Sequence, residues 1–501
     1  MTPQTWQIIA MVIYFAGMIA LGLIALRRTS DLGDYMLGGR SLHPGVAALS
    51  AGASDMSGWL LMGLPGALYL NGLVELWIAI GLTVGAWLNW MFVAPRLRSY
   101  TEVANDSITV PSFLENRLRD RSRMIRIVSG LIILVFFTFY VSSGMVAGGT
   151  FFQSSFGMNY HFGMLLVSGI VVVYTLMGGF LAVSWTDTVQ GTMMLIALIL
   201  VPIVGIIHLG GFDGWKAGID QVTASGEVNL FSMVTGVSVI AVASNIAWGL
   251  GYFGQPHIIV RFMALRNPGE AKQARRIGMS WMVLSLVGAA ATAFVGIAIF
   301  QHDETRLANP ETVFLAMGQL LFHPLVGGLI LAAVLAAIMS TISSQLLVSS
   351  SALIEDIYRG LFKKQLSPGR GVMVGRISVL IVAVVAAVLA WDPQSNILTL
   401  VGFAWGGFGA AFGPLILLAL FWRKLTWQGA LTGMIAGALT VFVWKYVLAA
   451  NYVDSVPIFG LYEIVPGFLV NLVLAVAISF ATYRHNEEVQ AEFDAAVDAT
   501  R

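Results

Sequence analysis

The chain consists of long apolar runs separated by shorter segments that hold most of its charged residues. A helical crossing of a bilayer needs about 20 predominantly apolar residues. Thirteen runs meet this requirement and are numbered spans 1 to 13 in chain order. They cover roughly residues 6–26, 44–69, 73–95, 125–151, 162–183, 187–207, 233–254, 278–300, 325–351, 372–391, 396–420, 428–448 and 463–483. The pattern therefore predicts an all-α polytopic membrane protein with thirteen transmembrane helices.

The composition supports a membrane protein and excludes some kinds of chemical site. Hydrophobic residues make up 57% of the 501 positions and charged residues 11%, whereas soluble domains carry about 25% charged residues. The absence of cysteine excludes disulfides and thiolate metal sites. We expect a lipid bilayer as the surroundings, no cofactor and no nucleic-acid partner.

The basic residues lie on alternating connections between the spans. Of the 27 lysines and arginines, 24 fall on one side of the predicted membrane, and only Lys216, Arg306 and Lys445 fall on the other. Because basic residues accumulate on the cytoplasmic side, this predicts an outside N-terminus and an inside C-terminus. The protein is thus predicted to be a multi-pass protein of the bacterial cytoplasmic (inner) membrane.

Span 2 is unusual at its centre. Asp55 lies near mid-depth, where a carboxylate costs roughly 2.5–3.5 kcal/mol on insertion scales. Gly52 and Gly58 flank it, and glycine allows a membrane helix to unwind and expose backbone carbonyls. A helix that is weak and polar at mid-depth is most simply interpreted as a binding site.

Span 7 contains a second break of the same kind. Gly249, Gly251 and Gly254 fall within six residues, and Pro256 follows, so a continuous helix is not expected. The alternative is a glycine-rich packing helix. Because spans 2 and 7 are five apart, we predict inverted repeats of spans 2–6 and 7–11, with spans 1, 12 and 13 peripheral. The corresponding segments are 1–43, 44–207, 208–232, 233–420, 421–483 and 484–501.

Span 9 carries hydroxyls on one helical face. Ala337, Ser340, Thr341 and Ser344 recur at helical spacing. Hydroxyls and carbonyls are hard oxygen donors that suit a small alkali cation, although membrane Ser and Thr also bond to their own preceding turn. With the unwound span 2 and Asp55 nearby, a cation site is favoured.

Several further residues have two interpretations. Trp59, Tyr140, Trp248 and Tyr252 suit the walls of an apolar pocket, whereas most tryptophans of such chains lie at the membrane interface. An enzyme is not expected, because Asp55 has no partner carboxylate, histidine or metal set at mid-membrane.

Two charges near the inner side are also ambiguous. Asp187 either assists cation release or caps the start of span 6. Arg40 is either a gate or pathway residue or part of the positive-inside bias.

Four separated stretches resemble one family. Residues 48–59, 178–187, 248–257 and 339–341 are similar, in order, to motifs of the sodium/solute symporter family, in particular its proline-transporting branch. The resemblance covers essentially the whole chain. It implies a LeuT-like fold with an extra span before a ten-helix core.

The resemblance also implies roles for individual residues. Backbone oxygens of Ala53, Met56 and Ala337 and the hydroxyls of Ser340 and Thr341 would bind sodium, the coupling ion. Asp55 matches the carboxylate that the family needs for coupling. The positions linked to substrate are Ser57, Gly58, Trp59, Tyr140, Trp248, Tyr252 and Pro256. Arg40 and Asp187 match functionally sensitive positions.

The expected activity is therefore sodium-coupled uptake of L-proline by alternating access, performed by a monomer. The alternatives are a sodium symporter for another small solute such as pantothenate or a sugar, a proline sensor or transceptor, and a channel.

Overall fold

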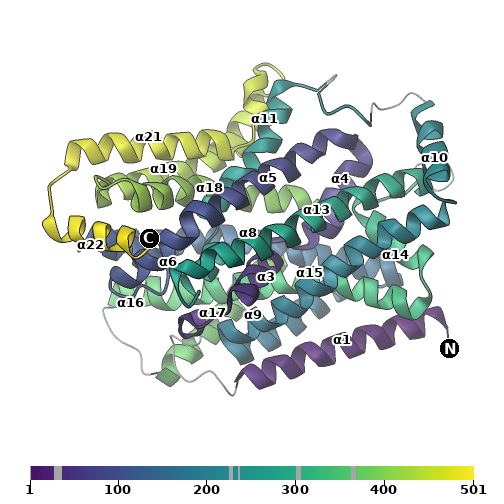
Figure 1. Cartoon of the computed structure of the whole chain (residues 1–501), viewed down its shortest axis with the longest axis horizontal. Helices are drawn as coiled ribbons and strands as arrows, with labels where there is room; N and C mark the ends of the chain where they lie inside the picture. The colour runs from purple at the N-terminus through teal and green to yellow at the C-terminus, as the bar shows by residue number, and fades with distance from the viewer. Residues whose placement is uncertain are drawn as a thin grey trace.

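The computed structural model describes residues 2–26, 36–224, 230–234, 237–300, 306–362 and 368–500. Their regular structure is helical, apart from one isolated β-bridge between Leu42 and Leu265 (Figure 1). The helices are α1 (Pro3–Leu26), α3 (Pro44–Asp55), α4 (Leu64–Asn71), α5 (Leu76–Leu88), α6 (Ala94–Val103), α7 (Val110–Leu118), α8 (Met124–Phe156), α9 (Tyr160–His208), α10 (Phe212–Ala224), α11 (Val239–Ala247), α12 (Pro256–Met263), α13 (Ala271–Phe300), α14 (Val313–Leu321), α15 (Pro324–Ser351), α16 (Arg359–Phe362), α17 (Pro368–Leu389), α18 (Ile397–Phe421), α19 (Trp427–Val443), α20 (Ala450–Tyr452), α21 (Ile464–Thr482) and α22 (Glu487–Asp498).

Many of these helices have the length and composition of membrane spans. Within the described residues, nine helical segments are long and apolar enough to cross a membrane, and three shorter apolar helices accompany them. The prediction of an all-helical polytopic architecture is confirmed. Arg27 and Arg28, which contribute to the predicted orientation, lie outside the described residues.

The helical segments differ in how much of their surface is buried. In the most apolar stretches of the Pro324–Tyr358 and Ile397–Phe421 segments, 83% and 89% of residues are buried, compared with 33% for the α1 segment Pro3–Ile24. The value is 28% for Trp427–Tyr452 and 33% for α21. Figure 1 shows α1 along one edge of the bundle and α19 and α21 along the opposite edge. The helices α1, α19 and α21, at the positions of the predicted spans 1, 12 and 13, are thus less buried than the two central segments.

The central helix α15 packs against α1, α3, α8 and α9, and α18 packs against α8 and the broken segment that follows α11. Small residues allow these close contacts. A Cβ atom on Gly407 of α18 would lie 2.0 Å from the Phe136 ring of α8. The Phe136 ring is itself held between Phe403, Phe408 and Phe442, so it cannot move aside.

Spans 5 and 6 join at a different place from the predicted one. The helix labelled α9 is kinked at Gly179, which has φ 59° and ψ −156°, a conformation that favours glycine. The predicted boundary at 184–186 was therefore a few residues late. Asp187 lies eight residues after the kink, inside the second helix, so its interpretation as a helix cap is wrong.

Helical periodicity at residues 311–321 predicts a helix that lies along the surface. The segment forms a short 3-10 turn, Pro310–Thr312, followed by α14. Val313, Phe314 and Met317 are fully buried. The segment is thus an integral part of the bundle rather than a surface helix.

Gly407→Ala is expected to destabilise the fold by about 1–3 kcal/mol, because the new methyl group overpacks a fixed aromatic cluster. The measurement is the midpoint of thermal unfolding in detergent. Gly169→Ala is the matched control, since no atom lies within 4 Å of its added Cβ. Equal midpoints for the two variants would contradict the close packing of α18.

Candidate functional site

The first break lies at the end of α3. Helical geometry stops at Asp55, and Met56 has φ −85° and ψ 78°. A π-helical turn, Trp59–Gly63, then leads into α4. Span 2 is therefore two half-helices joined at residues 56–58, as predicted.

The second break lies between α11 and α12. Residues Trp248–Gly254 form a 3-10 segment, Gln255 is extended, and Pro256 opens α12. A Cβ on Gly251 would lie 1.9 Å from Trp405 Nε1, so a side chain here would prevent contact with α18. The predicted break in span 7 is confirmed.

Oxygen atoms from α3 and α15 meet at one point. Ser340 Oγ lies 2.7 Å from Ala53 O and 3.1 Å from Ala337 O, so its single hydrogen can be donated to either carbonyl. Thr341 Oγ1 lies 3.4 Å from Ala53 O and 3.3 Å from Ala337 O. The structure thus brings together four of the five residues predicted to bind a cation. Met56, the fifth, is buried at the end of α3, three residues after Ala53.

This group of oxygens has the chemistry of an alkali-cation site. Both hydroxyls carry lone pairs that are free to turn toward a cation once the hydrogen bonds to the carbonyls are given up. The two carbonyl oxygens are then available to the same ion. We refer to Ala53, Ala337, Ser340 and Thr341 as the oxygen cluster.

Asp55 connects the two breaks. Its Oδ2 accepts a hydrogen bond from the hydroxyl of Tyr252 in the second break. Its backbone oxygen accepts from Trp59 Nε1 at 2.9 Å and from Tyr140 hydroxyl at 3.3 Å. Within the described residues, Oδ1 is buried and has no hydrogen-bond partner. Three of the predicted substrate residues therefore surround Asp55.

The other predicted substrate residues lie around this centre in different ways. Ser57 Oγ accepts from the Trp59 backbone N–H at 3.3 Å. Gly58 packs against α8 and α15, since an added Cβ would be 3.0 Å from Ala147. The Trp248 ring stacks on Trp405 and Tyr462, so it packs against α18 and the start of α21. Pro256 lines a separate cavity of ≈ 20 Å³ between α7, α12 and α15.

Arg40 joins three segments of the chain. Its guanidinium donates to Asp106 Oδ1 at 2.9 Å, to Thr101 Oγ1 at 3.1 Å, and to the carbonyls of Ser107 and Met263 at 2.8 Å each. The residue has φ 52°. Arg40 thus ties the segment before α3 to the α6–α7 connection and to the end of α12.

Asp187 belongs to a buried ion pair. Arg261 NH2 lies 3.2 Å from its Oδ2, and Ser50 Oγ donates to the same oxygen at 2.7 Å. Arg261 also donates to Ser344 Oγ at 2.7 Å and to His257 O at 2.5 Å. The pair lies between α3, α9, α12 and α15, and both side chains are fully buried.

Arg261 was not among the sequence-derived site residues. It had been counted as a basic residue of an inner connection, because span 7 was ended at residue 254. The structure continues the helix as α12 to Met263. The apolar residues Ile258, Ile259 and Phe262 around Arg261 are the signal that could have placed it inside.

Two further residues hold the second break and were also missed. Trp405 Nε1 donates to Trp248 O at 2.7 Å, and its ring meets Tyr252 edge-on with ring centroids 5.0 Å apart. Asn89 Nδ2 donates to Tyr252 O at 3.0 Å. A tryptophan in an apolar span is easily assigned to the membrane interface, and only the tertiary contact distinguishes Trp405.

Comparison with known proteins gives consistent results. Residues 35–437 match the sequence model of the Sodium:solute symporter family. The chain is 54% identical over 477 residues to the high-affinity proline transporter PutP of Bacillus subtilis (strain 168), covering 95% of this chain and 98% of that protein. It is 51% identical over 502 residues to the sodium/proline symporter of Staphylococcus aureus (strain JH9), covering 99% and 97%.

A solved structure has the same fold. It is a Na+-coupled sialic acid symporter in a substrate-bound outward-open state, with a TM-score of 0.78 and 20% sequence identity. The match covers 96% of this chain and 99% of that one.

Asp187→Asn and Arg261→Gln should each lower the free energy of unfolding by about 3–5 kcal/mol, because each leaves one buried charge unpaired. The double variant should lower the free energy of unfolding by clearly less than the sum of the two single effects. Thermal or denaturant unfolding in detergent measures all three.

Asp494→Asn is the control for this cycle. It removes an ion pair to Arg423 in which the side chains are 54% and 47% exposed, so its cost should be about 0–1 kcal/mol. Additive effects of Asp187→Asn and Arg261→Gln would contradict a coupled buried pair.

Proposed function

Because this chain belongs to the sodium:solute symporter family, we propose that it couples sodium entry to the uptake of L-proline. The names of relatives that are more than half identical over nearly the whole chain support proline as the solute. The observation that carries the sodium half of the proposal is the contact of the Ser340 and Thr341 hydroxyls with Ala53 O at the break of span 2.

In this proposal sodium binds at the oxygen cluster and at Met56 O. The ion replaces the hydrogen bonds that now link the Ser340 and Thr341 hydroxyls to the Ala53 and Ala337 carbonyls. A cation between α3 and α15 fastens the first half of span 2 to span 9. Because the unwound segment 56–58 follows directly, sodium binding restricts the backbone that forms the solute site.

Proline binds beside Asp55. It is a zwitterion with an apolar ring, so it requires an anion for its ammonium group, donors for its carboxylate and an apolar wall. The unpartnered Oδ1 of Asp55 is a suitable acceptor for the ammonium. The backbone N–H of Gly58 at the break is suited to the carboxylate, whereas the Ser57 N–H already donates to Asp55 O at 3.0 Å.

Aromatic side chains complete this site. Trp59, Tyr140 and Tyr252 already contact Asp55, and their rings supply apolar surface beside it. We assign the ring of proline to this wall. Trp248 and Pro256 lie outside this wall, where Trp248 supports the second break and Pro256 begins α12 directly after it.

The proposed topology has thirteen crossings, an outside N-terminus and an inside C-terminus, with spans 2–6 and 7–11 as inverted repeats. Both broken helices then occupy the first position of a repeat, as in other transporters with such repeats. Release toward the cytoplasm requires the inner contacts of Arg40 and the Asp187–Arg261 pair to rearrange. One chain contains all of these parts, so the proposed functional unit is a monomer.

The driving force is sufficient for concentrative uptake. One sodium ion entering at −100 mV gains about 2.3 kcal/mol, and a tenfold sodium gradient adds about 1.4 kcal/mol. Together these sustain a proline gradient of roughly 500-fold at one-to-one coupling.

Purified protein in proteoliposomes should accumulate radiolabelled proline when an inward sodium gradient is imposed, and should not do so in potassium or choline alone. Competition with unlabelled pantothenate and sugars identifies the solute. Proline uptake that does not depend on sodium would contradict the proposed coupling. Stronger competition by another solute would show that proline is not the preferred solute.

The variant Ser340→Ala/Thr341→Ala should raise the sodium concentration for half-maximal uptake by at least about tenfold, because charge-assisted oxygen contacts are worth roughly 1.5–3 kcal/mol each. Ser168→Ala is the control, since its buried hydroxyl donates to Met164 O of its own helix at 2.6 Å. An unchanged sodium dependence in the double variant would place the ion elsewhere.

A further inference from the structure

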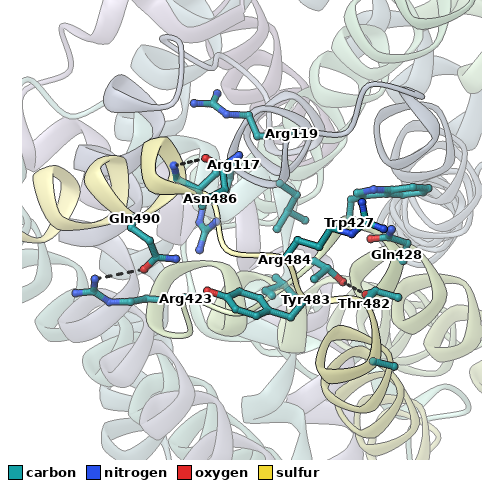
Figure 2. Close-up of a pocket in the computed structure, with 15 residues that line it drawn as sticks. Arg117, Arg119, Arg423, Trp427, Gln428, Thr482, Tyr483, Arg484, Asn486 and Gln490 are labelled. Atoms are coloured by element: carbon teal, nitrogen blue, oxygen red, sulfur yellow. Dashed lines mark hydrogen bonds between the residues drawn. The ribbon is translucent and has the colours of Figure 1, made fainter.

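A second site lies far from both breaks, near the C-terminal helix. A cavity of ≈ 550 Å³ opens between α7, the α18–α19 connection, the end of α21 and the start of α22 (Figure 2). In the proposed topology this is the cytoplasmic side. Its lining includes four arginines, Arg117, Arg119, Arg423 and Arg484. We call it the arginine pocket.

Two of these arginines are already paired with α22. Arg119 contacts Glu492 at 2.5 Å and Glu488 at 3.7 Å. Arg423 contacts Asp494 at 2.5 Å and reaches Gln490 at 3.5 Å, as drawn in Figure 2. Their charges are therefore largely balanced within the protein.

Arg117 is different. It is fully buried, and its Nε donates to Ala419 O at 3.3 Å. Within the described residues, NH1 and NH2 have no hydrogen-bond partner, and the guanidinium packs against the rings of Tyr100 and Phe493. Burial lowers the pKa of Arg117 from its usual value, and nearby Glu492, which already pairs with Arg119, offsets only part of this effect. A buried guanidinium with two unsatisfied nitrogens is costly unless an anion joins it.

The remaining lining suits a phosphate group. Arg484 is exposed and has no ion pair among the described residues. Apart from the Arg117 Nε–H that donates to Ala419 O, the two guanidinium groups present N–H donors in rigid forks, the geometry that recognises phosphate oxygens. Neutral donors lie beside them in Thr426, Thr482, Asn486 and Gln490.

The position of the pocket favours a lipid over a soluble phosphate. Trp427 begins α19 and Tyr483 follows α21, and both line the pocket. Trp and Tyr typically lie at the level of lipid headgroups. From this level, exposed apolar side chains continue along α19 and α21, among them Leu439, Val473 and Phe480, which are 58%, 62% and 61% exposed. They offer a surface for acyl chains.

We propose that the arginine pocket binds the phosphate-bearing headgroup of an anionic phospholipid, with Arg117 and Arg484 as its cationic contacts. Basic pockets between helices on the cytoplasmic side commonly hold such headgroups. The bound lipid joins α7, α19, α21 and α22 through one ligand. This site is independent of the sodium and proline sites.

Native mass spectrometry of the full chain in detergent, titrated with phosphatidylglycerol, tests the proposal. Arg484→Gln should weaken binding by roughly fivefold, the effect of one surface arginine near anionic lipid. Arg117→Gln should weaken it further. Because Arg117 is buried and its variant could fail to fold, the exposed Arg484 variant keeps the test decisive.

Arg121→Gln is the matched control, since Arg121 is exposed, lies two residues from Arg119 and does not line the pocket. It should bind as the unaltered chain does. Two results would overturn the proposal. One is retention of phosphatidylcholine as strong as that of phosphatidylglycerol, and the other is a loss of binding in Arg121→Gln as large as in Arg484→Gln. Displacement of the lipid by millimolar inorganic phosphate would show a soluble anion to be the ligand and would overturn the lipid assignment.

Discussion

The structure depends on hydrogen bonds to the backbone groups that the two broken helices leave without a helical partner. Within a membrane, a carbonyl outside a regular helix must find its hydrogen bond in the protein. Here side chains provide the donors, most of them from neighbouring helices and one, Trp59, from the broken span itself. Ser340 and Thr341 reach Ala53 O, and Trp59 and Tyr140 reach Asp55 O. The second break follows the same rule, with Trp405 at Trp248 O and Asn89 at Tyr252 O.

The N–H donors and the hydroxyl donors differ in whether a cation can replace their hydrogen bonds. Indole and amide N–H groups can only donate, so the contacts of Trp405 and Asn89 hold the second break in one shape. Hydroxyls both donate and accept, so Ser340 and Thr341 can exchange a hydrogen bond for a cation. The first break is therefore the one suited to an ion, while the second supplies Tyr252 to Asp55.

Much of this arrangement could be predicted from the sequence, because it depends on local composition. Apolar runs located the helices, and clustered glycines with Asp55 or Pro256 located both breaks. The spacing of hydroxyls in span 9 indicated the oxygen cluster. The features that could not be predicted depend on contacts between helices that are distant in the sequence. Arg261 was misplaced because span 7 was ended at the break, although the apolar residues around Arg261 continue the helix.

The same limit applies to individual side chains. The sequence placed Trp248 beside a break but could not show that its ring turns toward Trp405 and Tyr462. The interpretation of Asp187 as a helix cap failed because the kink occurs at Gly179, a few residues earlier than the polar residues suggested.

The buried pair of Asp187 and Arg261 has an electrical consequence. A carboxylate that faced a mobile cation would change its local charge whenever that ion arrived or left. Arg261 belongs to the protein itself, so the charges of Asp187 and Arg261 sum to zero even when the pair rearranges for release. The membrane potential does work on net charge that crosses the field, and a neutral pair moves through it with little cost. The voltage sensitivity of the cycle then resides with the transported ion and the unpaired Asp55.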